Sequence, residues 1–123
     1  MKINNIEIGG EPITEIISDS IELSSAQDAV DMMAKCFPSG SRKLIIHQKN
    51  ICPEFFDLKT RVAGEILQKF INYYFKIAIV GDFSKYTSKT LKDFIYESNK
   101  HGEINFVESV EEARQKLTKT AGR

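Results

Sequence analysis

The stretch FFDLKT, residues 55–60, places an acid, a base and a hydroxyl directly before an amphipathic run. One interpretation is a helix start, where Asp57 or Thr60 accepts hydrogen bonds from free N–H groups and stabilises the helix by about 1 kcal/mol. The other is an anion site, because a helix N-terminus favours a phosphate and Lys59 adds a positive charge. Capping alone explains the residue types, so it is the preferred interpretation.

Further polar side chains follow the ends of the expected strands. In open α/β sheets, ligands bind beyond the carboxyl ends of the strands, so a site is expected there. The candidates for a ligand or phosphate are Asp57, Lys59, Thr60, Asp82 and Ser84, and the candidates for a pocket are Asp19, His47, Glu54 and Tyr86. The alternative is structural, because loops are polar and helices need caps.

The known catalytic and metal-binding patterns are not found in the sequence. The segment VGDFSKYTSK holds one glycine, unlike a phosphate-binding loop, and Asp82 is read as a turn residue. Cys52 and His47 suggest a nucleophilic pair, but a small loop residue followed by Pro53 at the start of a short turn is preferred. Histidine and cysteine spacing fits no zinc site. We therefore predict no catalytic residue, metal or cofactor, and we favour a protein that is not an enzyme.

Composition narrows the class of protein. The 123 residues carry 17 basic and 17 acidic side chains, which argues against binding to nucleic acid. Apolar runs are too short to span a membrane, and we expect neither a signal peptide nor membrane insertion. Two cysteines do not suggest a disulfide framework, so a cytoplasmic location is expected.

The hydrophobic pattern predicts the elements that must position these residues. A hairpin turns at Gly9-Gly10, because glycine supplies the positive φ angles of a tight turn. Short apolar runs predict strands buried on both faces, as in a parallel sheet covered by helices. Serines with an acid or amide three residues later predict helix starts. The expected strands are 3–8, 12–17, 43–47, 75–81 and 104–107, and the expected helices start at Ser24, Thr60, Thr87 or Ser88, and Ser109.

The order is therefore β-β-α-β-α-β-α-β-α, a single α/β domain over residues 1–118 with a mostly parallel five-stranded sheet. The polar tail, residues 119–123, is expected to fray. Gly64 is interpreted as a site of close helix packing against the sheet. The apolar face of the helix from 60 to 74 is expected to comprise Ala63, Ile66, Leu67, Phe70, Ile71 and Tyr74.

Several segments carry a family resemblance. FFDLKT, AGEILQKF, AIVGDFS and DFIYESN, with ITEI, SSAQDAVDMM and VEEA around them, resemble the bacterial family called domain of unknown function 4180. The resemblance covers nearly the whole chain. It implies no particular activity.

The element order also resembles the STAS fold of anti-sigma-factor antagonists and of cytoplasmic domains of anion transporters. In regulatory STAS domains, a serine or threonine follows an aspartate at the head of the helix after the third strand. Asp57 stands at the corresponding place here, but Leu58 and Lys59 follow it and Thr60 is the nearest hydroxyl. The resemblance supports the fold, and the departure weakens a phosphorylation switch.

Two functions follow as hypotheses. The first is a small regulatory or interaction module that meets a protein or a small anion near the helices starting at Thr60 and Thr87. The alternative is an anion-binding protein or enzyme that uses Asp19, His47, Asp57 and Asp82 at the strand ends. A concave pocket lined by these four residues, with shifted pKa values, would favour the second, and a flat or apolar exposed patch the first. The first hairpin strand also predicts a homodimer, because an edge strand can pair with its own copy.

Overall fold

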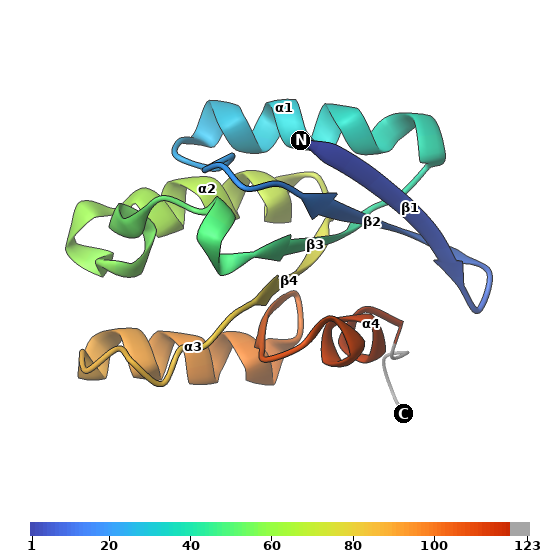
Figure 1. Ribbon diagram of the computed structural model, residues 1–123. Helices are drawn as coiled ribbons and strands as arrows, with labels where there is room; N and C mark the ends of the chain where they lie inside the picture. Colours follow the sequence, from blue (N-terminus) through green and yellow to red (C-terminus); the bar gives the residue numbers. More distant parts are fainter. Residues whose placement is uncertain (119–123) are drawn as a thin grey trace.

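The computed structural model describes residues 1–118, and the predicted fraying of 119–123 lies outside these residues. The described part forms one five-stranded sheet and four α-helices, in the order expected from the hydrophobic pattern of the sequence (Figure 1). The α/β prediction is therefore confirmed. The elements are β1 Lys2–Ile8, β2 Glu11–Ile17, α1 Ala26–Cys36, β3 Lys43–His47, α2 Val62–Asn72, β4 Lys76–Val80, α3 Lys89–His101, β5 Ile104–Val107 and α4 Val110–Thr118.

The strands lie in the order β1-β2-β3-β4-β5. β1 and β2 pair antiparallel, and every later pair is parallel. The hairpin turns at Gly9 and Gly10, whose φ angles are 61° and 84°, as a two-residue turn requires. β1 is an edge strand, so its outer edge is where the expected homodimer would form, and dimerisation stays a prediction.

The two faces of the sheet are covered differently. Leu44 and Ile46 belong to a large core shared with α1 and α2, while Ile45 belongs to a smaller core shared with α4. This alternation places successive side chains of β3 on opposite faces. Figure 1 shows α1 and α2 next to each other. α3 packs against β5, and its Leu91 belongs to the same large core as α1 and α2. The prediction that β3 and β4 are buried on both faces is confirmed.

The helix expected from Thr60 to Tyr74 is shorter than predicted. α2 begins at Val62, because Leu58–Thr60 forms a separate 3-10 turn and the chain then passes through Arg61 with a φ of 66°. Its buried residues are Ala63, Ile66, Leu67 and Phe70. The placement of Ile71 and Tyr74 on the buried face was wrong, since they are 40% and 84% exposed. Tyr74 follows the helix with a φ of 61°, which turns it away from the core.

The predicted helix starts are mostly confirmed. Ser88 and Ser109 accept hydrogen bonds from the N–H groups of Leu91 and Glu112, at 3.2 and 3.1 Å. For α1 the prediction was one residue early. Ser25, rather than Ser24, accepts from the N–H of Asp28, and the Asp28 carboxylate accepts from the N–H of Ser24. Ser25 is therefore the residue that caps α1.

Candidate functional site

The FFDLKT segment forms a self-contained turn. The Thr60 hydroxyl lies 2.7 Å from the Glu54 carbonyl oxygen and 2.8 Å from that of Asp57, and it accepts from the N–H of Val62 at 3.2 Å. The Asp57 carboxylate accepts from the N–H of Lys59 at 3.3 Å. The polar atoms of Asp57 and Thr60 are thus engaged in holding the turn and the start of α2. Such contacts are those of a capping structure.

Asp82 and Ser84 form a second small turn after β4. The Asp82 carboxylate accepts hydrogen bonds from the Ser84 hydroxyl at 2.6 Å and from the Ser84 N–H at 3.0 Å. These hydrogen bonds from Ser84 favour the charged form and lower the pKa of the Asp82 carboxyl below its ordinary value. This geometry matches the turn interpretation of Asp82.

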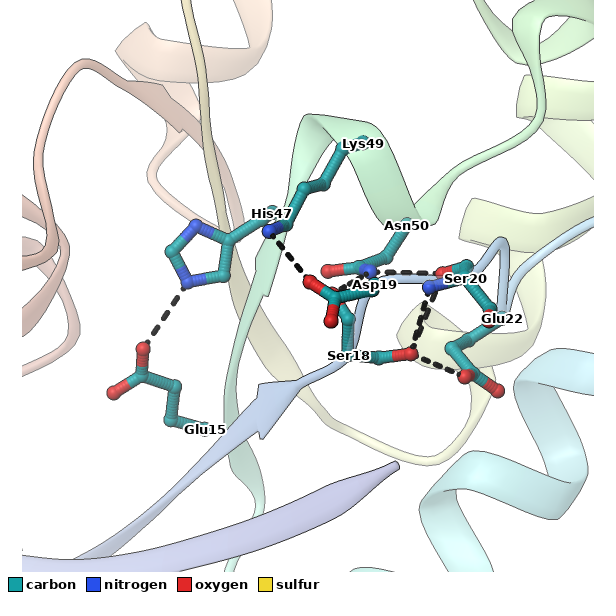
Figure 2. A network of polar contacts seen from close by, with 8 residues as sticks. All are labelled: Glu15, Ser18, Asp19, Ser20, Glu22, His47, Lys49 and Asn50. Carbon is teal, nitrogen blue, oxygen red and sulfur yellow. Dashed lines mark hydrogen bonds and ion pairs between the residues drawn. The ribbon is translucent and has the colours of Figure 1, made fainter.

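Asn50 connects the loop after β2 to the loop after β3. Its side chain is fully buried and its amide nitrogen donates to the carbonyl oxygens of Ser18 and Ser20, each at 2.8 Å. The backbone carbonyl oxygen of Asn50 accepts from the N–H groups of Glu22 and Leu23. Figure 2 shows the hydrogen bonds of the Asn50 side chain, and the Ser18 hydroxyl donating to Glu22 at 2.6 Å. Asn50 therefore holds residues 18–23 against the end of β3.

His47 and Asp19 are not brought together. The His47 ring nitrogen Nε2 lies 3.1 Å from a carboxylate oxygen of Glu15, whose side chain is 9% exposed. Figure 2 shows the ring turned toward Glu15 and away from Asp19, which meets Lys49 at 3.4 Å instead. Arg114 of α4 approaches the second oxygen of Glu15 at 3.9 Å. His47 therefore belongs to a polar cluster with Glu15 and Arg114 on the face of the sheet that α4 covers.

Glu15 and Arg114 were missed in the sequence. For Glu15 the sequence contained a signal. Residues two apart in a strand share a face, so Glu15 lies on the same face as the apolar Ile13. Only the parallel pairing of β2 with β3 places Glu15 and His47 side by side.

A pocket lies at the carboxyl ends of β2, β3 and β4, with a volume of about 340 Å³. Of the nine predicted site residues, Tyr86 lines this pocket, whereas the others, among them Asp57, Thr60 and Asp82, do not. The lining residues are Ile21, Gln48, Lys49, Ile51, Pro53, Phe56, Lys85 and Tyr86.

Gln48 forms the polar wall of this pocket. Its side-chain nitrogen donates to the Tyr86 hydroxyl at 2.6 Å, and its oxygen accepts from the N–H of Asp82 at 3.1 Å. The side chain crosses directly over Gly81, where an added Cβ would lie 2.4 Å from the Gln48 oxygen. The Tyr86 ring stacks on Phe56 with centroids 5.1 Å apart. Sequence reasoning missed Gln48; the lone glycine after β4 was the one signal of a close approach.

An apolar groove runs between α2 and α3. It consists of two adjoining cavities of about 250 and 560 Å³, which share Gly64, Gln68 and Phe94. An added Cβ at Gly64 would meet nothing within 4 Å, so the prediction that Gly64 allows close packing on the sheet was wrong. Gly64 is exposed and leaves the groove open. The remaining lining residues are Leu58, Arg61, Ala63, Glu65, Leu67, Ile71, Ser98, His101, Glu103 and Ile104.

Residues 1–118 contain neither a candidate metal centre nor a helix that could span a membrane. No group of three or more histidine, cysteine, aspartate or glutamate side chains in this part of the chain is placed to hold a metal ion. None of the described helices combines the length and apolar character required for crossing a bilayer.

Comparisons with known proteins identify a family. No curated protein matches the sequence. Among solved structures, a putative anti-sigma factor antagonist from Thermotoga maritima is similar over 95% of each chain, with a TM-score of 0.45 and 11% identity. That likeness concerns the general path of the chain. The model of the family described as domain of unknown function (DUF4180) matches residues 8–117, and the chain therefore belongs to this family.

Proposed function

We propose that this protein is an interaction module, and that the groove between α2 and α3 binds an amphipathic helical segment of a partner protein. The observation that carries the proposal is the open, apolar floor of the groove. Leu67, Phe94 and Ile104 line it, and Ile71 is 40% exposed there. Apolar grooves between helices are a recurrent docking place for the apolar face of another helix.

The length of the groove favours a peptide segment over a small molecule. The lining residues extend from Arg61, at the head of α2, to Ile71, near its end. Ten residues of helix span about 15 Å, which matches two to three turns of a docked helix. A segment with apolar side chains at positions i, i+3, i+4 and i+7 would place one row along this floor.

The rim of the groove carries charges of both signs. Arg61 and Glu65 lie at one end, and His101 and Glu103 at the other. A mixed rim creates no strong field of one sign, in keeping with a chain of 17 basic and 17 acidic residues. We therefore expect a partner segment whose apolar side chains supply the affinity and whose polar face is not strongly charged.

A library of peptides displayed on phage tests the proposal. Selected peptides should be amphipathic and bind the wild-type protein. Gly64→Leu fills the groove from its floor and should weaken binding at least about tenfold, since one well-packed apolar contact is of that order. Thr90→Leu is the matched control, because it adds the same side chain to an exposed position of α3 that does not line the groove.

Thermal unfolding should show that both variants are folded. If no amphipathic peptide is selected, or if the selected peptides bind Gly64→Leu as tightly as wild type, the groove is not the docking surface.

A further inference from the structure

We propose that the pocket at the carboxyl ends of β2, β3 and β4 binds a small organic anion with an apolar body. This inference does not depend on peptide binding in the groove between α2 and α3. The pocket lies beyond the ends of three neighbouring strands, which is where open α/β sheets bind ligands. Its volume of about 340 Å³ falls in the range of small-molecule sites.

The floor of the pocket is apolar and firmly packed. Ile51 is 3% exposed and Phe56 is 7% exposed, and Pro53 lies between them in sequence. Ile21 borders the same space from the loop after β2 and is half exposed. An apolar group bound here would displace water from Ile21 and leave the core unchanged. Displacing this water makes a hydrophobic contribution to binding.

The walls are held in place before any ligand arrives. Gln48 is fixed by its two hydrogen bonds to Tyr86 and to the N–H of Asp82, and the glycine at 81 leaves room for it. Stacking on Phe56 fixes the Tyr86 ring. A site whose side chains are already fixed loses less conformational entropy on binding.

Both charged residues that line the pocket are lysines, Lys49 and Lys85. The ammonium group of Lys85 lies 5.5 Å from the centre of the Tyr86 ring, at the wall of the pocket. Lys49 has a carboxylate partner, Asp19, but the 3.4 Å contact is between two largely exposed side chains and contributes little. Lys49 is therefore free to turn toward a bound anion. The lining carries no carboxylate that would repel one.

The ligand class follows from this combination. An apolar floor requires an apolar body, and two ammonium groups at the rim require a carboxylate, sulfonate or phosphate at one end. Gln48 adds a polar group that orients the ligand.

Naphthoate and indole acetate are suitable test compounds, each paired with its neutral amide. Their binding is followed by ¹H–¹⁵N chemical shifts of the full-length protein. We expect dissociation constants below about 1 mM, shifts concentrated in residues 48–51 and 81–86, and binding of the amides at least about tenfold weaker. The double variant Lys49→Met, Lys85→Met should lose about tenfold in affinity for the acids and should bind acid and amide alike.

Lys92→Met is the control, because it removes an exposed lysine of α3 that does not line the pocket, and its affinity should equal that of wild type. Several results would overturn the proposal. They are no binding of either acid, shifts confined to α2 and α3, equal binding of acids and amides to the wild type, or an unchanged affinity in the double variant. Shifts confined to α2 and α3 would assign the compounds to the groove.

Discussion

Gly64 lines the groove between α2 and α3, whereas Gly81 lies beneath Gln48, the polar wall of the pocket at the strand ends, and the two glycines have opposite surroundings. At Gly64 an added Cβ would meet nothing within 4 Å, whereas at Gly81 it would lie 2.4 Å from one atom of Gln48 and 2.6 Å from another. The groove is therefore an open surface, and the pocket wall is closely packed around a polar side chain. A glycine in a sequence marks either situation, and only the neighbours of its Cα distinguish them.

The same contrast holds for the polar groups of the two regions. Around the pocket, Gln48 and Asn50 hold separate loops together by hydrogen bonds. Along the groove, Gln68 bonds within its own helix, to Asn72, and Leu67, Phe94 and Ile104 form an apolar floor. The pocket thus has the rigid polar wall of a site for a small ligand, and the groove has an apolar lining in which Ile71 is exposed, as expected of a docking surface.

The largest effect is expected at Gly81. Gly81→Ala should lower the free energy of unfolding by about 1–3 kcal/mol, because the new methyl group overlaps the Gln48 side chain. Urea unfolding measures this. In the background Gln48→Ala the same substitution should cost much less, and a double-mutant cycle isolates the coupling. Additive effects would mean that Gln48 does not lie over Gly81, and the contrast between the two glycines would fail.

A smaller effect is expected at Asn50. Asn50→Ala removes two hydrogen bonds to the carbonyl oxygens of Ser18 and Ser20, and should lower the free energy of unfolding by about 1–2 kcal/mol. Amide hydrogen exchange should also become faster at Glu22 and Leu23, whose N–H groups bond to the backbone of residue 50. Gln68→Ala, in the groove, is the comparison. If exchange at residues 22 and 23 is unchanged in Asn50→Ala, the loop is held by something else.

The smallest effect, opposite in sign, is expected at Gly64. Gly64→Ala should raise the free energy of unfolding by up to about 1 kcal/mol, because alanine is the better helix former and the site is open. A higher midpoint of thermal unfolding would sharpen the contrast with Gly81→Ala. A lower midpoint would show that Gly64 is closely packed, as its sequence context first suggested.

The fold could be predicted because local signals agree with one another. The glycine pair at the hairpin, the serines before α3 and α4, and the apolar runs of β3 and β4 each act over a few residues. Helix boundaries were less accurate. α2 starts at Val62 rather than Thr60, since the hydroxyl that suggested a helix start instead holds a preceding turn.

A pocket lies at the sheet edge where the sequence predicts a site, but most of its lining residues were not named from the sequence. Tyr86 was named from the sequence and lines the pocket, but Gln48, Lys49 and Lys85 were not. The acids Asp57 and Asp82 attracted attention by their type, although their hydrogen bonds stay within their own turns. Residue type indicates what a side chain can do, whereas its partners decide whether it is free to do it.

By itself, the sequence determined the α/β class, the order of strands and helices, and the edge of the sheet where polar loops gather. Periodicity, turn residues and caps are local, so they can be read along the chain. Only the tertiary structure decided that His47 faces Glu15 instead of Asp19, that Gln48 reaches over Gly81, and that Gly64 is exposed. The contacts of His47 and Gln48 join residues some thirty positions apart in the sequence, which the parallel strand register brings together. The exposure of Gly64 depends on how the helices pack.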